Sequence, residues 1–195
     1  MRMWPGESPA VAAEHQSLED ALSRRRSVRL FSEHTLSEDE ILNLCWAAQG
    51  ITDPRGRRTA PSAGGRYPLE LYVATPDGCY AYDPPHHRML RRTANDLRTA
   101  LQGGALSQEA VGQSPAVFVV AAQPWRTIAE YGRRGSRYVH LEAGHAAQNL
   151  LLEATAMGLG SVPIGAFDDE RLRDILDLPA DREVVYLIPV GKPAP

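Results

Sequence analysis

The stretch that most constrains the fold is "SRYVHLEAGHAAQNLLLEATAMGLG", residues 136–160, which contains no proline and is closed by glycines. It predicts an α-helix of several turns, because proline breaks the helical hydrogen-bond ladder and glycine commonly ends a helix. Within it lies a run of small residues suited to close packing: Ala143, Gly144, Ala146 and Ala147. We therefore expect one long helix that another element approaches closely.

Capping signals predict shorter helices elsewhere in the chain. Ser17 precedes "LEDALSRR", whose acidic residues suit the first turn of a helix. Ser37 and Glu40 form a capping box ahead of "ILNLCWAAQ", and Gly50 can end that helix. Two further helices are expected, one near "ANDLRTALQ" (94–102) and one over "DDERLRDILDL" (168–178).

Several segments have strand patterns. "PLELYVAT" (68–75) alternates apolar and polar residues, and "GCYAYD", "PPHH" and "RMLRR" predict a hairpin that turns on its prolines. "PAVFVVAA" (115–122) is apolar on both faces, which is typical of a central strand. "SVPIGAF" (161–167) predicts a short strand or extended segment, and "EVVYLIPVG" (183–191) predicts the last strand. Together these elements indicate an α+β fold.

The length, composition and net charge of the chain limit the classes of protein to which it can belong. A chain of 195 residues with 43% hydrophobic residues predicts one domain, over residues 17–195, after a flexible arm of residues 1–16. A net charge of −3 argues against a nucleic-acid binder. Cys45 and Cys79 lie far apart without metal-ligand spacing, and neither a signal peptide nor a membrane span is recognisable, so we expect a cytoplasmic protein.

Residues 51–66, "ITDPRGRRTAPSAGGR", predict a long loop rich in glycine, proline and arginine. Long ordered loops in a compact domain are usually functional. The arginine clusters "RGRR" and "YGRRGSRY" lack the interleaved aromatic platform of an RNA-binding surface. They could instead govern the access of an anionic cofactor or substrate.

Four segments follow one another in an order that resembles a known family. "RRSVRLF", "PSAGGRYPLELYV", "EAGHAAQNLLLEATAMGLGSVPIGAFDDE" and "YLIPVGKP" are similar to segments of the nitroreductase superfamily of flavin enzymes. "GIT", "RTAPSAGGRYPLELYV", "YAYDP" and "EAGHAAQNL" look most like its SagB-type, or azoline (thiazoline/oxazoline) dehydrogenase, branch. The resemblance covers the chain from about Leu18 to Pro193.

The resemblance implies a mostly antiparallel sheet flanked by helices, in an intertwined homodimer with FMN at the subunit interface. It assigns Arg25, Arg26, Ser27 and Arg29 to the flavin phosphate and ribityl chain. Arginine suits this role because its planar fork offers paired N–H donors to a phosphate. The alternative, taken on the residues alone, is a solvated arginine run that favours the helix dipole.

Two further segments are assigned to the cofactor by the resemblance. "PSAGGRYP" implies that Pro61, Ser62, Ala63 and Gly65 reach the flavin of the partner subunit. Many classical nitroreductases carry asparagine at the place of Gly65 and a Gln-Pro-Trp run at the place of "YPL", and this departure favours the SagB-like branch. The alternative is an ordinary glycine-rich turn into a strand.

"VPIGAF" implies a backbone along the reactive N5 edge of the flavin, formed by Pro163, Ile164, Gly165 and Ala166. A backbone N–H there can tune hydride transfer without a titrating side chain. Lys192 stands where the family commonly adds a basic phosphate contact, and a solvated terminal lysine is the alternative.

The catalytic residues implied are Tyr131 and Glu130, because SagB-like dehydrogenases often show a Lys-Tyr pair at this point. Here glutamate replaces the lysine, and a carboxyl can still act as a base when burial desolvates it. The substitution could equally indicate another substrate. Arg137, Tyr138 and His145 are expected in the same neighbourhood, with His145 as a packing or interface residue rather than a catalyst.

We therefore expect an FMN-dependent oxidoreductase that transfers a hydride between its substrate and flavin N5, in the manner of enzymes that oxidise azolines to azoles in peptides. One alternative is an NAD(P)H-dependent reductase of nitroaromatics or quinones. The other is a non-catalytic flavin-binding scaffold subunit. No metal is expected, because His140 and His145 are five residues apart and do not share a helix face.

Overall fold

The structure, a computed structural model, describes residues 17–195; the arm expected over residues 1–16 lies outside this part. Its centre is a six-stranded sheet in the order β3-β2-β1-β4-β6-β5, in which all neighbouring strands are antiparallel. The strands are β1 (Leu69–Thr75), β2 (Gly78–Asp83), β3 (Arg88–Thr93), β4 (Ala116–Ala122), β5 (Gly160–Ser161) and β6 (Glu183–Gly191). The predicted α+β fold is confirmed.

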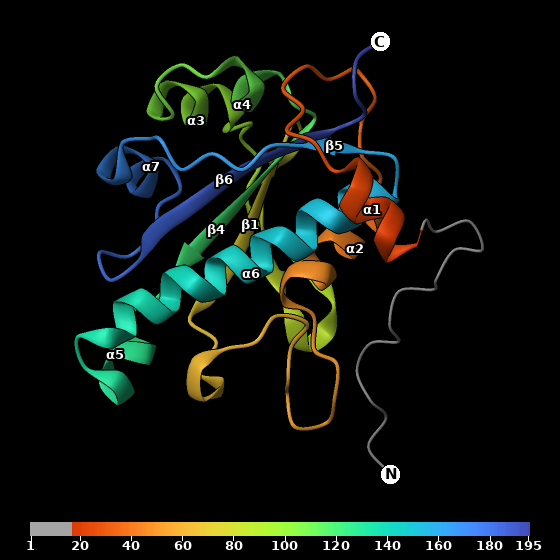
Figure 1. Cartoon of the computed structure of the whole chain (residues 1–195). Coiled ribbons are helices and arrows are strands. Elements are labelled where there is room, and N and C mark those ends of the chain that lie inside the picture. Colours follow the sequence, from red (N-terminus) through yellow and green to blue (C-terminus); the bar gives the residue numbers. More distant parts are fainter. Residues whose placement is uncertain (1–16) are drawn as a thin grey trace.

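Helices cover both faces of the sheet (Figure 1). One face carries α2 (Glu38–Gln49) and the long α6 (Arg134–Ala156), and the other carries α3 (Arg98–Gly104), α4 (Glu109–Gln113) and α7 (Asp169–Ile175). The remaining elements are α1 (Leu18–Arg24), α5 (Trp125–Tyr131), η1 (Ala63–Gly65) and η2 (Pro84–His86). Within residues 17–195, none of the helices has the length and apolar character needed to cross a membrane.

Strand β4 joins the two hydrophobic cores, as its sequence predicts. It lies between β1 and β6, and every one of its residues is buried. Phe118 and Val120 belong to the core under α2 and α6, whereas Val117 and Val119 belong to the core under α3, α4 and α7. A strand covered on both faces needs apolar residues at consecutive positions, because successive side chains point to opposite faces.

The capping signals correctly located the first two helices. The Ser17 hydroxyl caps α1, and Ser37 and Glu40 form a complete capping box at α2, where the Glu40 carboxylate accepts from the Ser37 N–H at 2.7 Å. The helices α4 and α5 were not predicted. Both are short, and α5 exposes its large apolar residues Trp125 and Ile128, so no buried apolar stripe marks it in the sequence.

Three of the four small residues of α6 pack in the interior of this chain. Ala143, Ala146 and Ala147 are buried in the core that α6 shares with α2 and the sheet. Only Gly144 faces open space. The close approach that the three alanines permit is used for packing within this chain.

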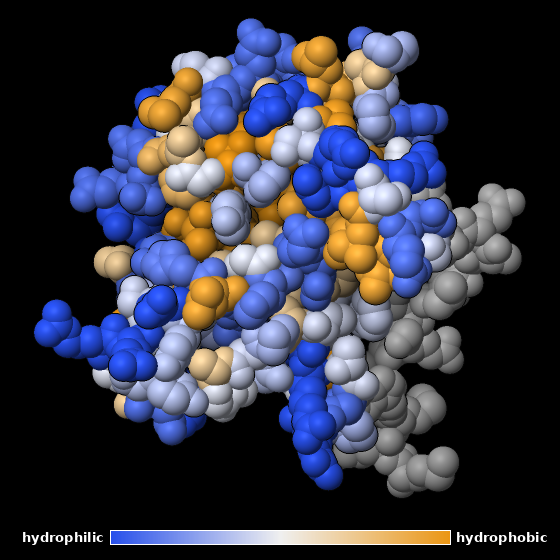
Figure 2. Space-filling model, in the orientation of Figure 1, coloured by the Kyte–Doolittle hydropathy of each residue, from blue (hydrophilic) through white to orange (hydrophobic). Residues whose placement is uncertain are grey.

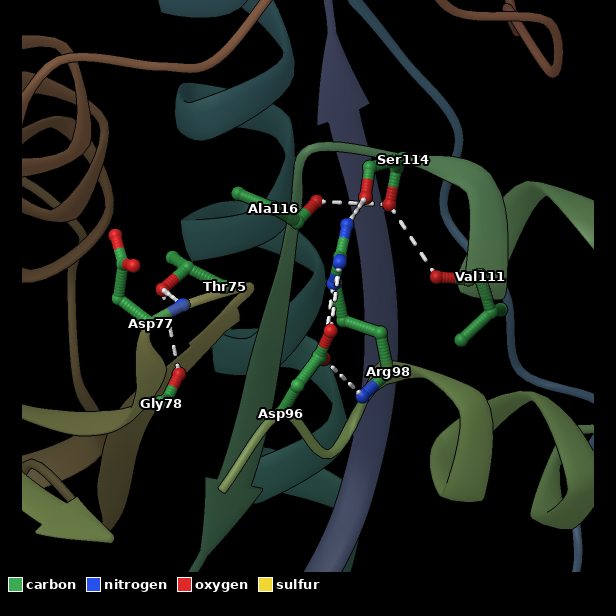
Figure 3. Close-up of polar contacts among 8 residues, drawn as sticks. All are labelled: Thr75, Asp77, Gly78, Asp96, Arg98, Val111, Ser114 and Ala116. Atoms are coloured by element: carbon green, nitrogen blue, oxygen red, sulfur yellow. Dashed lines mark hydrogen bonds and ion pairs between the residues drawn. The ribbon is translucent and has the colours of Figure 1, made fainter. Parts of the chain in front are cut away.

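Arg98 joins the start of α3 to the start of β4 (Figure 3). Its guanidinium forms an ion pair with Asp96 at 2.7 Å and donates to the Ser114 carbonyl at 2.8 Å. The Ser114 hydroxyl in turn donates to the Ala116 carbonyl at 3.0 Å. This network holds the connection after β3 against the central strand.

Candidate functional site

Three segments that are distant in the sequence lie side by side where α6 ends. We call them, residues 25–32, 160–166 and 192–194, the arginine half-site. Main-chain hydrogen bonds join them: Val28 N–H to the Ser161 carbonyl at 3.0 Å, Ser32 N–H to the Lys192 carbonyl at 2.9 Å, and Ala194 N–H to the Leu30 carbonyl at 3.0 Å. Ser27 also bridges Ser161. The structure thus brings together the residues that the resemblance assigned to the flavin phosphate and to its N5 edge.

The arginine half-site carries four cationic side chains: Arg25, Arg26, Arg29 and Lys192. The Arg26 guanidinium donates to the carbonyls of Ser23 at 2.9 Å and Arg25 at 2.8 Å, so it is engaged at the end of α1. Among residues 17–195, the side chains of Arg25, Arg29 and Lys192 make no hydrogen bond or ion pair. Two guanidinium groups and one ammonium group therefore remain available to an anion.

Residues 163–166 form the edge of this half-site. Ile164 is buried and exchanges two main-chain hydrogen bonds with Leu187 of β6, at 2.8 and 3.0 Å. The next two residues, Gly165 and Ala166, are exposed, and their N–H groups have no partner in the described part of the chain. This edge can therefore offer two consecutive backbone donors to a ligand.

A second group of residues lies beneath α6 (Figure 1). The loop of residues 51–68 is tied to α2, because Thr59 donates through its N–H to the Gly50 carbonyl at 2.9 Å and through its hydroxyl to the Trp46 carbonyl at 3.1 Å. It is tied to α6 by Asn149, whose amide donates to the Thr59 carbonyl at 3.3 Å. We call this loop, together with α5 and Glu142, the loop half-site.

The glycines of the loop half-site adopt the backbone that only glycine adopts easily. Gly64 and Gly65 have φ of +59° and +64°. A Cβ atom on Gly64 would lie 2.7 Å from the phenol oxygen of Tyr131, so the absence of a side chain lets this ring cover the loop. The other predicted residues here are exposed or half-buried: Pro61, Ser62 and Ala63.

The two predicted catalytic residues contact this loop. Glu130 forms an ion pair with Arg66, and the Tyr131 ring meets the Tyr138 ring edge to face with centroids 5.2 Å apart. The Glu130 side chain is 45% exposed, so the burial that would desolvate it as a base is not present in the single chain. Tyr138 lies in the expected neighbourhood, whereas His145 is an exposed residue about two turns further along α6.

The buried acid of this region is Glu142, which sequence reasoning missed. Its side chain is 2% exposed and one of its carboxylate oxygens has no hydrogen-bond partner among the described residues. Burial raises the pKa of Glu142 to about 7, while the Ser62 hydroxyl and the charges of Arg58 and Arg126 act in the opposite direction. The only available signal was a glutamate among the buried positions of a long amphipathic helix.

Within one chain, Glu142 and the arginine half-site lie towards opposite ends of α6. The loop half-site contacts this helix from Glu142 to Asn149, whereas the arginine half-site lies beyond Ala156. The fourteen steps from Glu142 to Ala156 rise about 21 Å at 1.5 Å per residue. Among residues 17–195, no cluster of three potential metal ligands occurs.

The chain belongs to the nitroreductase family, because the family profile of that description matches residues 22–192. It is 43% identical, over 92% of each chain, to the nitroreductase-named protein MJ1384 of Methanocaldococcus jannaschii. It is 28% identical to a protein of Thermus thermophilus named NADH dehydrogenase, over 89% of this chain and 85% of that one. Its fold matches a nitroreductase crystal structure from Ralstonia eutropha JMP134 with a TM-score of 0.86, at 29% identity over 98% of this chain and 89% of that one. The chain is therefore a nitroreductase-family oxidoreductase.

Proposed function

We propose that the protein binds FMN and transfers a hydride between its substrate and the flavin N5. The observation that carries this proposal is the arginine half-site, in which main-chain hydrogen bonds gather unpaired cationic side chains and free N–H groups from three distant segments. Its donors fit the cofactor, because a phosphate needs several fixed cationic donors and a flavin ring edge accepts hydrogen bonds. Members of the family generally bind FMN.

Each part of the half-site has a role in this proposal. Arg25 and Arg29 bind the phosphate, with Ser27 and Lys192 beside them. The N–H groups of Gly165 and Ala166 orient the reactive edge of the ring. Bound FMN would supply two-electron chemistry, and the chain supplies binding, orientation and a proton acceptor.

We also propose a homodimer, because each complete site needs both half-sites, and within one chain Glu142 and the end of α6 lie about 21 Å apart along that helix. A two-fold related copy packed along α6 would bring the loop half-site of one subunit to the arginine half-site of the other. The outer surface offers exposed apolar residues for this contact: Leu18 and Leu22 on α1 and Leu141 on α6. Figure 2 shows an apolar patch over α1.

For the substrate we propose an azoline ring in a modified peptide, following the resemblance of "RTAPSAGGRYPLELYV" to the SagB-type branch. The ring would lose a hydride to the flavin and a proton to the pair of Glu130 and Tyr131, which gives the aromatic azole. Oxygen or another acceptor would then take the two electrons. In the dimer the partner subunit would cover Glu130, which supplies the burial that the single chain lacks.

A second candidate is an NAD(P)H-dependent reductase of nitroaromatics or quinones, which uses the same site in the reductive direction. The names of the two relatives, nitroreductase and NADH dehydrogenase, favour it. The two candidates differ in the hydride donor, and a rapid-mixing experiment under anaerobic conditions can separate them.

The test begins with the visible spectrum of the purified protein and chromatographic identification of the heat-released cofactor. A yellow protein with about one FMN per chain is expected. Anaerobic mixing with NADH, and separately with a thiazoline-containing peptide, then shows which compound bleaches the flavin. A colourless protein that also takes up no added FMN would contradict the flavin proposal and leave a scaffold role.

A further inference from the structure

A pocket opens at the start of β1. Strands β1 and β2 pair only from Tyr72–Ala81 to Thr75–Gly78, so the start of β1 and the end of β2 separate. Tyr82 and Asp83 pair with β3 instead. The gap holds a cavity of about 390 Å³ lined partly by apolar side chains, which is within the usual range for small-molecule sites.

The pocket is strongly cationic. Four arginines line it, Arg58, Arg92, Arg126 and Arg182, with Glu70 as the one acid. Glu70 is already bound by Arg182 at 3.0 Å and by the Tyr72 hydroxyl at 3.0 Å. The side chains of Arg92 and Arg126 make no hydrogen bond or ion pair with any residue of the described chain. Two positive charges at this pocket are therefore not neutralised by an ion pair.

The inner wall of the pocket contains buried donors without acceptors. Gln49 is 1% exposed, and its amide oxygen accepts from Arg58 at 2.5 Å, while its amide nitrogen has no partner among residues 17–195. The Arg58 Nε is likewise buried without a partner. Because a buried unpaired donor costs free energy, such groups indicate an absent acceptor.

The electrostatic surroundings of Arg58 also favour a bound anion in this pocket. Burial lowers the pKa of Arg58, and the positive charge of Arg126 lowers it further. Glu142 attracts both arginines but does not line the pocket. An anion bound at Arg126 would offset the repulsion between Arg126 and Arg58.

We propose that this pocket binds a small organic molecule that carries a phosphate or carboxylate group, held by Arg92 and Arg126 at a place distinct from the arginine half-site. The guanidinium fork suits both oxyanions. The apolar part of the ligand would contact Leu69, Leu71 and Pro179 on the walls. Because Arg58 and Ser62 lie in the same loop, the bound anion would also stabilise the loop half-site.

The test uses the FMN-loaded protein, in which the flavin phosphate occupies the arginine half-site. Inorganic phosphate and succinate are titrated separately at constant ionic strength, with chloride as the balancing anion, while thermal unfolding is followed. A saturable rise in melting temperature of about 3 °C or more is expected with at least one of them. The anion that raises the melting temperature, phosphate or succinate, identifies the oxyanion that the pocket prefers. If neither anion raises the melting temperature more than chloride does, the proposal is overturned.

Variants locate the effect. In the double variant Arg92→Gln/Arg126→Gln, the anion concentration that gives half of the maximal rise in melting temperature should increase at least tenfold. Arg91→Gln/Arg171→Gln, which removes two exposed arginines outside the pocket and both half-sites, is the matched control and should respond as the original protein does. If the double variant does not fold, Arg92→Gln alone is used, because this side chain is exposed on the edge strand β3. An anion response that Arg92 and Arg126 variants retain but Arg25→Gln/Arg29→Gln loses would place the anion at the flavin site and overturn the proposal.

Discussion

The two half-sites are built in opposite ways. The arginine half-site is joined by main-chain hydrogen bonds, and its unpaired side chains are the half-buried Arg25 and the exposed Arg29 and Lys192. The loop half-site is held by partly buried side chains, including Arg58 on Gln49 and Asn149 on the Thr59 carbonyl, with Glu142 buried behind Ser62. Changes at the first should therefore affect ligand binding more than stability, and changes at the second should affect stability as well.

The largest expected effect is at the arginine half-site. Replacing Arg25 and Arg29 by alanine removes two charge-assisted contacts to the flavin phosphate, each of which contributes about 1.5–3 kcal/mol. FMN affinity, measured by flavin fluorescence quenching, should fall by about 10²–10⁴-fold. Because neither side chain has a partner in the described chain, the melting temperature of the flavin-free protein should not change. Undiminished FMN binding in this variant would refute the phosphate role.

The next largest effect concerns the buried carboxyl of the loop half-site. The pKa of Glu142 is raised from its ordinary value of 4.5 to about 7, so the folded protein holds a proton there that the unfolded chain releases. Stability should therefore fall as the pH rises through this interval, by up to about 3 kcal/mol. Glu142→Gln should remove this fall in stability. Urea denaturation of the original protein and of the variant at each pH gives the unfolding free energies, and the change in their difference with pH gives the size of the effect.

The exposed Glu109→Gln variant is a control for the change in net charge. The prediction is contradicted if the unfolding free energies of the original protein and of Glu142→Gln differ by the same amount at every pH from 4.5 to 8. Glu142 would then not titrate in the folded protein in this range.

A smaller effect separates backbone strain from side-chain contact in the loop. Gly56→Ala and Gly64→Ala both place a side chain at positive φ, +78° and +59°, and each should cost about 1 kcal/mol of unfolding free energy. Only at Gly64 does the new Cβ meet a neighbour, the Tyr131 phenol oxygen at 2.7 Å, whereas at Gly56 nothing lies within 4 Å. We expect Gly64→Ala alone to lower the rate of flavin reduction by the substrate. Equal rates in both variants would mean that the position of Tyr131 does not matter for catalysis.

The smallest effect is expected at Lys192. Its side chain is exposed and unpaired, and exposed ion pairs contribute at most about 1 kcal/mol. Lys192→Ala should weaken FMN binding by less than about fivefold and reduce its dependence on salt. A loss as large as that of the double arginine variant would make this lysine a principal phosphate contact.

The sequence by itself determined the elements whose signals are local. The capping box at Ser37 and the doubly apolar run of β4 each depend on neighbours within a few residues, so composition and spacing were sufficient. The ordered motifs also gave the nitroreductase family, which the family profile over residues 22–192 confirmed. The short helices α4 and α5 were not predicted, because neither is long enough to show apolar residues repeating at helical spacing.

Tertiary structure alone decided which of these residues lie together. It used the alanines of α6 for packing against α2, engaged Arg26 at the end of its own helix, and left Arg25 and Arg29 free. It also separated β1 from β2 and gathered Arg58, Arg92 and Arg126 around one pocket. Such outcomes depend on contacts between residues tens of positions apart, because burial and charge pairing are set by what the rest of the chain places beside a side chain.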